Sequence, residues 1–410
     1  MALRSPMALL TVGTLLSQFL IFSSTIFMGH LYSPSQFGFY ALIVSLASII
    51  ALTLSRSLET FIVPAKSVVE AEAIYVTSIR LVFRQWLFMM VFLIVVLFAF
   101  EIAGASKLTS VVTILFSLIL APLLALYSLS YQLILRSQNY GVLATRGPLQ
   151  NSAIGVNQWI LHHSYFQNFG LVLGEMLGRI VSLTFLFVNV RTISRKLPQK
   201  IFKSHGVQKI DKPIVVNLIS IAFDLAAASA LLIYVNLNFG ESLAGQLSMA
   251  QKIAVVPIVF LGANLAQYFL SSSSDSHRKG FSMSRTSLDS LILKLMLISI
   301  TIGAIFFFLG PIILRTFLGP EWVDSEQMIK FLLPGMVVSF IWNPLSSYFY
   351  VRNLWAEFLK VSTLRFFFMC LSGLLAKLAQ CNVHEAIVLI TMANAVIQVY
   401  GLHVLRKDFR

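Results

Sequence analysis

The chain has 410 residues, of which 58% are hydrophobic and only 11% are charged. A soluble globular domain carries about a quarter charged residues, so this composition excludes an ordinary water-soluble protein and indicates a surface that faces hydrocarbon. The formal net charge is +14, and the chain has two cysteines. Two cysteines are too few for a disulfide framework, and the net charge would suggest nucleic-acid binding only if the protein were soluble.

Apolar windows of about 20 residues, long enough to cross roughly 30 Å of hydrocarbon, predict twelve transmembrane spans. The first window is too long for a signal-peptide core, so we expect it to stay in the mature protein. The fifth window is the weakest because Arg146, Asn151, Asn157 and Gln158 interrupt it. The predicted spans are 7–28, 38–55, 85–104, 110–134, 144–162, 169–190, 213–236, 243–268, 290–310, 327–350, 360–380 and 385–404.

Lysine and arginine fall on one side of this twelve-span arrangement. Short cytoplasmic loops carry such an excess, so both termini are predicted to be cytoplasmic and the basic balance to be a topology signal, with no nucleic acid as partner. The opposite loops carry little beyond Lys107, Arg315 and Lys377. The basic residues on the predicted cytoplasmic side are Lys66, Arg80, Arg84, Arg136, Arg191, Arg195, Lys196, Lys200, Lys203, Lys209, Lys212, Arg278, Lys279, Arg285, Arg352, Arg406, Lys407 and Arg410.

The longest basic stretch divides the predicted spans into two sets of six. We expect an N-terminal lobe over 1–190 (spans 1–6), a basic cytoplasmic linker over 191–212, and a C-terminal lobe over 213–410 (spans 7–12). A short similarity between residues 37–42 and 244–249, which open the second and eighth spans, is typical of transporters built from repeated halves. The predicted fold class is an all-α integral membrane protein with two six-helix lobes around a central cavity.

Charged residues inside the spans are the candidate site, because placing a charge in hydrocarbon costs at least about 2.5 kcal/mol. Glu175 and Arg179 lie four residues apart on the sixth span and can pair on one helix face. Asp224 and Lys252 lie near the middle of the seventh and eighth spans, and each carboxylate has a plausible basic partner. These residues predict a cationic, partly salt-bridged cavity for an anionic group; the alternative is a set of static ion pairs that hold helices together.

Other basic residues of the spans are expected to have simpler roles. Arg56, Arg146 and Lys294 lie near predicted cytoplasmic ends, where long side chains can snorkel to the interface. Arg80 and Arg84 fit a surface amphipathic turn, and the alternative is contact with anionic lipid.

Sequence patterns of common enzymes and of nucleotide binding are missing. The chain has no phosphate-binding glycine loop with its lysine, no HExxH pattern and no nucleophile elbow. The cysteines, Cys370 and Cys381, do not have zinc spacing with histidines. We therefore expect a transporter and not an enzyme, with no metal and no cofactor.

Two segments resemble a known transporter family. One is Leu31-Tyr32-Ser33-Pro34-Ser35-Gln36-Phe37-Gly38-Phe39-Tyr40, which leads into the second span, and the other is Leu318-Gly319-Pro320-Glu321-Trp322, between the ninth and tenth spans. Both resemble patterns of oligosaccharide flippases, the Wzx-type members of the multidrug/oligosaccharidyl-lipid/polysaccharide exporter superfamily. The twelve-span, two-lobe outline is similar over the whole chain.

The resemblance implies a flippase that moves undecaprenyl-diphosphate-linked oligosaccharides, such as O-antigen or capsule repeat units, across a bacterial inner membrane. Alternating access of a cavity would be driven by a proton or cation gradient. Arg179 and Lys252 would bind the diphosphate beside Glu175 and Asp224, while Gln251, with Asn217 and Gln246, would line the path of the sugars. Membrane lipids, and the polymerase and chain-length proteins of the same pathway, are the further partners that the resemblance implies.

Three alternatives remain open. A multidrug or cation antiporter of the same superfamily would favour carboxylates over arginines in its cavity. A lipid II flippase would usually be longer. A membrane-embedded O-antigen polymerase would normally carry a large arginine-rich outer loop, which this chain lacks, and a membrane-embedded acyltransferase belongs to the same class of alternative.

Overall fold

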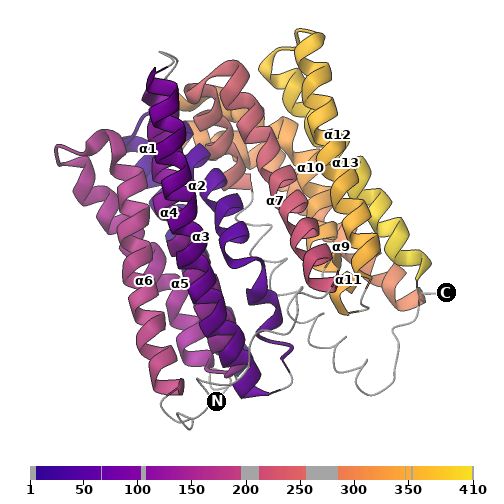
Figure 1. The fold of residues 1–410 in the computed structure, drawn as a ribbon. Helices are drawn as coiled ribbons and strands as arrows, with labels where there is room; N and C mark the ends of the chain where they lie inside the picture. Colours follow the sequence, from indigo (N-terminus) through magenta and orange to yellow (C-terminus); the bar gives the residue numbers. More distant parts are fainter. Residues whose placement is uncertain are drawn as a thin grey trace. The chain divides into compact units, whose positions relative to one another are not determined.

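The computed structural model describes residues 6–65, 67–102, 108–194, 212–254, 285–346, 348–351 and 354–408 (Figure 1). Over these residues every regular element is a helix, as the sequence predicts. The elements are α1 (Pro6–Leu31), α2 (Pro34–Ser55), η2 (Leu58–Phe61), α3 (Val68–Ile102), α4 (Leu108–Arg136), α5 (Tyr140–His162), η3 (Gln167–Phe169), α6 (Gly170–Ser194), α7 (Lys212–Phe239), a helix over 241–254, α9 (Arg285–Leu318), η5 (Pro320–Trp322), α10 (Val323–Ser346), α11 (Tyr348–Val351), α12 (Trp355–Leu378) and α13 (Val383–Lys407).

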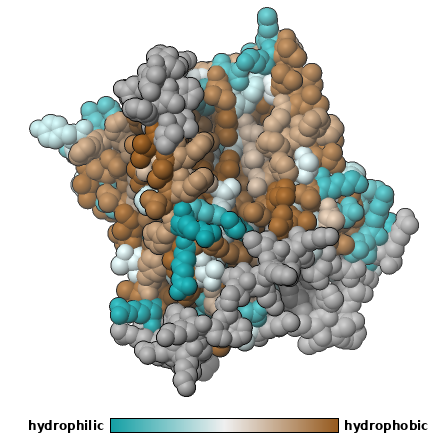
Figure 2. All heavy atoms as spheres, viewed as in Figure 1, coloured by the Kyte–Doolittle hydropathy of each residue, from teal (hydrophilic) through white to brown (hydrophobic). Residues whose placement is uncertain are grey.

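Ten of the described helices are long and apolar enough to cross a membrane. Figure 2 shows the matching surface, on which hydrophobic residues predominate over the helices. Of the other two predicted spans, α5 has the length but is too polar to be counted, which agrees with its interrupted window. The eighth predicted span, 243–268, is helical over 241–254, and its remainder lies outside the described residues. The prediction of an all-α polytopic membrane protein is confirmed.

The predicted start of the third span is wrong. The third span was expected to begin at residue 85, whereas α3 begins at Val68 and runs for 35 residues. Ser67 caps the helix by accepting a hydrogen bond from the Glu70 backbone N–H (3.1 Å), and no glycine or proline interrupts the chain from Val68 to Ile102. Arg80 and Arg84 therefore lie within a continuous helix and not in a turn.

The described chain forms two compact units, residues 1–24 with 39–218 and residues 25–38 with 219–410. The predicted linker, 191–212, lies outside the described residues except for the end of α6 and the first residue of α7. The lobe boundaries and the cavity between the lobes stay predictions. The assignment of residues 25–38 to the second unit means that α1 and α2 each contribute to both units.

Small residues allow close helix packing in the first unit. A Cβ atom on Gly174 or Gly178 of α6 would overlap the backbone of α5 at Gln158 or Ile154. A hydrogen bond also joins two helices of this unit: the Asn151 amide on α5 donates to the Ser17 hydroxyl of α1 (2.7 Å). Glycine contacts of this kind bring helices together where no hydrophobic effect operates between them. The polar residues that weakened the fifth window thus help to hold α5 against α1.

In the second unit, the two segments that carry the family resemblance pack against each other. The Trp322 ring meets Phe37 edge to face (5.2 Å between centroids), and its Nε1 donates to the Gly29 carbonyl (3.0 Å). Beside them, Gly38 of α2 lies against Gly245, with the Gly245 Cα facing the Pro34 carbonyl. Only glycine fits at this crossing, which accounts for the glycine that the segments 37–42 and 244–249 share.

We expect Gly245→Ala to destabilise the second unit, since its Cβ would overlap the Pro34 carbonyl oxygen. Overpacking of a tight contact typically costs about 1–3 kcal/mol. The thermal unfolding midpoint of the detergent-purified protein should fall by several degrees. Gly141→Ala is the matched control, because the nearest atom to its new Cβ would be 3.7 Å away; equal midpoints for both variants would contradict the packing.

Candidate functional site

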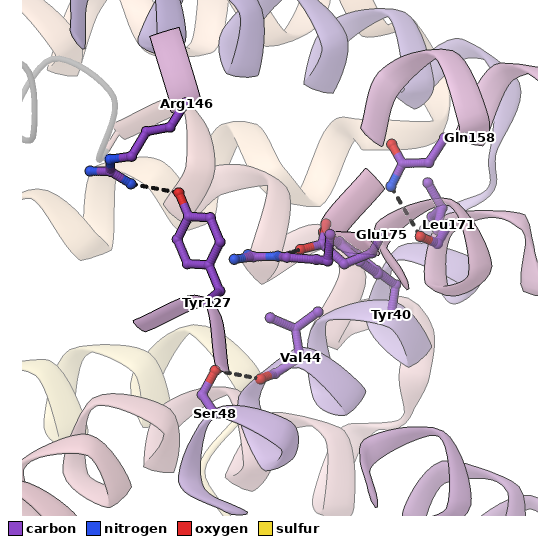
Figure 3. Close-up of polar contacts among 9 residues, drawn as sticks. Tyr40, Val44, Ser48, Tyr127, Arg146, Gln158, Leu171 and Glu175 are labelled. Carbon is purple, nitrogen blue, oxygen red and sulfur yellow. Dashed lines mark hydrogen bonds and ion pairs between the residues drawn. The ribbon is translucent and has the colours of Figure 1, made fainter. Parts of the chain in front are cut away.

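The predicted pair on the sixth span is formed. On α6, Arg179 Nε lies 2.7 Å from Glu175 Oε1, and the side chains are 18% and 5% exposed, respectively. The Tyr40 hydroxyl on α2 donates to the other carboxylate oxygen, Oε2, at 2.9 Å (Figure 3). Glu175 therefore has both oxygens engaged, which offsets the cost of burying its charge.

A second arginine lies next to this pair. Arg146 of α5 donates from Nη1 to the Tyr127 hydroxyl of α4 (2.5 Å) and stacks on the Tyr131 ring, with 3.8 Å from Cζ to the ring centroid. The Arg179 guanidinium lies 5.5 Å from the Tyr127 centroid, so Tyr127 contacts both arginines. Figure 3 shows Arg146 and Glu175 on either side of Tyr127.

The snorkelling predicted for Arg146 is wrong. Tyr127 lies nine residues before the end of α4, so the side chain extends along the inside of the unit and not toward the helix end. Stacking on tyrosine and the tyrosine hydroxyl stabilise a guanidinium in this place. The signal in the sequence was the spacing of Tyr127 and Tyr131, which puts both rings on one face of α4.

We call Tyr40, Tyr127, Arg146, Glu175 and Arg179 the arginine–tyrosine cluster. It holds two guanidinium groups and one carboxylate, which leaves one positive charge in excess. The buried Nε of Arg146 has no hydrogen-bond partner among the described residues. A donor without an acceptor next to excess positive charge is suited to an anion, and guanidinium groups match phosphate geometry.

The second unit contains a separate polar group that was not predicted. Arg365 of α12 forms an ion pair with Asp224 of α7 through Nη1, and its Nε donates to Asn394 Oδ1 of α13 at 2.7 Å. The basic partner of Asp224 is therefore Arg365, and not Lys252 or Arg179, the cations that the sequence analysis considered. An arginine within the predicted span 360–380 was the signal that could have identified this group. It ties three helices of the unit together.

The remaining predicted cation also lies in the second unit. Lys252 is partly buried on the helix over 241–254, and its ammonium group is 5.2 Å from the Phe37 ring centroid. Gln251, next to it on the helix, is partly buried as well. Binding of a diphosphate by Lys252 and contact of Gln251 with sugars stay predictions.

Two candidate sugar contacts have partners within the protein. Gln246 donates to the Glu321 carbonyl (2.6 Å) and accepts from the Ser325 hydroxyl (2.6 Å), so its amide holds the helix over 241–254 to the start of α10. Asn217 is buried and donates to the Thr60 hydroxyl at 3.0 Å. Their hydrogen bonds favour structural roles.

A buried carboxyl group outside the candidate spans was not predicted. Glu59 lies in η2, where burial raises its pKa above the usual value while a hydrogen bond with Ser55 lowers it in part. Its Oε2 has no hydrogen-bond partner in the part of the chain that the structure describes. No group of three or more potential metal-ligating side chains occurs among the described residues.

Solved structures with the same fold are transporters. The chain is 16% identical to the lipid II flippase MurJ in an inward closed conformation, covering 98% of this chain and 89% of that one with a TM-score of 0.71. An inward-facing multidrug resistance MATE family transporter of the MOP superfamily is 15% identical, with coverage of 96% and 94% and a TM-score of 0.65. A MOP superfamily transporter from Pyrococcus furiosus is 14% identical, with coverage of 99% and 97% and a TM-score of 0.65. The fold is thus that of the MOP transporters.

No curated protein sequence matches the chain. Residues 27–327, most of the chain, match the family described as polysaccharide biosynthesis protein. This chain belongs to that family, and it has the fold shared by the lipid II flippase and MATE structures.

We expect Arg365→Gln to destabilise the protein, because it leaves Asp224 without its ion-pair partner. Breaking a fully buried pair costs about 3–5 kcal/mol, and a smaller loss is expected here because the Asp224 side chain is 34% exposed, whereas replacing both members by neutral groups is often close to neutral. The thermal midpoint should therefore fall for Arg365→Gln and recover largely in the double variant Asp224→Asn with Arg365→Gln. Additive losses in the double variant would show that the two side chains act independently.

Proposed function

We propose that this protein is a flippase that translocates undecaprenyl-diphosphate-linked oligosaccharide repeat units, of the O-antigen or capsule type, across the bacterial inner membrane. Membership of the polysaccharide biosynthesis family supports a glycan-linked cargo, and the fold shared with MOP transporters supports transport. The observation that carries the proposal is the arginine–tyrosine cluster, where Arg179 pairs with Glu175 while Arg146 is held by Tyr127 and Tyr131, so that two guanidinium groups accompany one carboxylate.

A diphosphate is the part of such a substrate that the cluster suits. Arg146 and Arg179 provide planar guanidinium donors. Both guanidinium groups lie against the Tyr127 ring, which fixes their positions relative to each other. Charge-assisted hydrogen bonds to phosphate are about twice as strong as neutral ones, and low polarity around the site strengthens them further. Glu175 keeps Arg179 oriented, so the excess charge of the cluster resides mainly on Arg146.

Other residues have supporting roles in this proposal. Lys252 adds a cation in the second unit, and Gln251 beside it offers an amide to sugar hydroxyls. The pair of Asp224 and Arg365 holds α7 to α12 and supplies no excess charge. The lipid tail of the substrate needs no protein cavity, because it can remain in the bilayer.

Energy for transport would come from a proton or cation gradient, since the sequence shows no phosphate-binding loop for a nucleotide. Glu59 is suited to carry a proton, because it is buried, its pKa is raised, and one carboxylate oxygen lacks a partner among the described residues. Alternating access would couple this proton to movement of the substrate. Both termini would lie in the cytoplasm, as the distribution of lysine and arginine predicts.

A multidrug or cation antiporter is the nearest alternative, because MATE transporters share the fold. Binding of cations would require surplus carboxylates, whereas the two carboxylates of the candidate site each have an arginine partner, Glu175 with Arg179 and Asp224 with Arg365. The Pyrococcus furiosus transporter bears the description that reverse polarity of its binding pocket suggests a different function. The excess of arginine over carboxylate in the arginine–tyrosine cluster likewise favours an anionic substrate over the cationic substrates of an antiporter. A polymerase or acyltransferase finds no support in the fold.

The test of the proposal is deletion of the gene in its host, followed by analysis of surface glycan and lipid-linked intermediates. The expected result is loss of surface polymer with single lipid-linked repeat units on the cytoplasmic face. Repeat units that reach the outer face but remain unpolymerised would point to the polymerase class instead, and an unchanged glycan would refute the proposal.

Complementation with Arg146→Gln or Arg179→Gln tests the cluster. Removing a hydrogen bond to a charged group costs about 1.5–3 kcal/mol, so transport should fall by roughly 10- to 150-fold. The quantity of protein in the membrane should stay normal for Arg146→Gln. Arg179→Gln alone leaves the buried Glu175 without its partner, so its effect on transport is judged in the double variant Glu175→Gln with Arg179→Gln, which removes both charges of the pair. The matched control is Arg191→Gln, at the exposed end of α6. Normal surface glycan in both arginine variants would exclude the cluster as the anion site.

A further inference from the structure

An exposed pair of arginines on α3 is not used by the proposed transport site. Arg80 and Arg84 lie four residues apart on the helix, so they share one face with their Cβ atoms about 6 Å apart. Both are exposed, and no carboxylate forms an ion pair with either of them in the part of the chain that the structure describes. Two like charges at this spacing repel each other weakly, and a bound anion would remove this repulsion.

The surroundings of the pair are apolar. Phe83, Leu87 and Phe88 lie on the same stretch of α3 with 52%, 60% and 71% of their surface exposed. Figure 2 shows hydrophobic residues over much of the visible surface. Exposed phenylalanine and leucine next to exposed arginine is the composition expected where hydrocarbon meets lipid headgroups.

The position along α3 agrees with the interface. A helix of 35 residues is about 52 Å long, which exceeds the hydrocarbon thickness of roughly 30 Å, and the predicted apolar window from residue 85 makes its first turns the part expected outside the hydrocarbon. The two arginines lie 12 and 16 residues after Val68, close to residue 85, where the apolar window begins. Trp86, a residue type enriched at membrane interfaces, follows directly and donates from Nε1 to the Leu118 carbonyl (2.8 Å).

The neighbouring loop contributes a third cation. When the Gln85 amide is oriented to satisfy both of its ends, its oxygen accepts two hydrogen bonds from Arg56, at 2.6 Å from Nε and 2.9 Å from Nη2. Arg56 is therefore held beside α3 by a neutral group. The local charge is positive, and no acidic side chain that the structure describes neutralises Arg80 or Arg84 by an ion pair.

We propose that Arg80 and Arg84 form a binding site for the headgroup phosphate of an anionic glycerophospholipid at the predicted cytoplasmic interface. The two guanidinium groups would donate to one phosphate, and an acyl chain would lie along Phe83, Leu87 and Phe88. The charges and the exposed apolar residues both favour a lipid over a free phosphate. The site is independent of the transported substrate, and it does not depend on the proposed function.

Binding of phosphatidylglycerol to the purified full-length protein tests the site, with native mass spectrometry to count bound lipids and phosphatidylcholine as the zwitterionic comparison. Each interfacial arginine contributes about fivefold to binding of anionic lipid, so Arg80→Gln with Arg84→Gln should weaken phosphatidylglycerol binding by roughly 30-fold. Arg80→Lys with Arg84→Lys should retain most of it. The single variants, each with about a fivefold loss, keep the test available if the double variant fails to fold.

The matched control is Arg315→Gln with Lys377→Gln, which removes two exposed cations at other helix ends. This control should bind phosphatidylglycerol as the wild type does. Equal binding by the wild type and the Arg80→Gln with Arg84→Gln variant would overturn the proposal. Equal binding of phosphatidylcholine and phosphatidylglycerol would overturn the role of charge, and a preference of the pair for inorganic phosphate or undecaprenyl diphosphate over phosphatidylglycerol would overturn the phospholipid as occupant.

Discussion

Hydrocarbon does not solvate charge, and this constraint accounts for where the charged side chains of the described spans lie. A charged group within a span costs at least about 2.5 kcal/mol unless a partner or water stabilises it. Glu175 meets this cost with Arg179 and the Tyr40 hydroxyl, and Asp224 meets it with Arg365. Arg146 is different, because aromatic rings and one hydroxyl stabilise it without a carboxylate. The positive charge left on Arg146 is therefore the feature that most directly indicates an anionic ligand.

The two units use this constraint in different ways. In the first unit, the arginine–tyrosine cluster leaves excess positive charge beside α4, α5 and α6. In the second, the group of Asp224, Arg365 and Asn394 is balanced and joins three helices. Trp322 joins the two segments of family resemblance through Phe37, and the contact of Gly38 with Gly245 joins α2 to the helix over 241–254. Binding in one unit and rigid packing in the other would suit a transporter in which one unit holds the charge of the substrate.

Much of the fold was predictable because span length and apolar composition follow directly from bilayer thickness. The pair of Glu175 and Arg179 was predictable as well, since helical spacing alone places the two side chains together. Contacts between distant segments were not predictable, because nothing in the local sequence of Asp224 identifies Arg365, 141 residues later, as its partner. The start of α3 was missed for a related reason: helix continuity depends on the absence of glycine and proline, whereas the hydropathy window registers only the apolar part.

The most direct test of the proposed cargo is translocation by the purified protein in liposomes that contain an undecaprenyl-diphosphate-linked oligosaccharide. An impermeant glycosidase outside the vesicles would report the arrival of inner-leaflet substrate at the outer leaflet. The proposal predicts that the protein makes the protected half of the substrate accessible, faster than in protein-free vesicles and faster still with an imposed ion gradient. A rate equal to that of protein-free vesicles, with the same vesicles transporting a cationic drug, would contradict the flippase assignment and favour the antiporter.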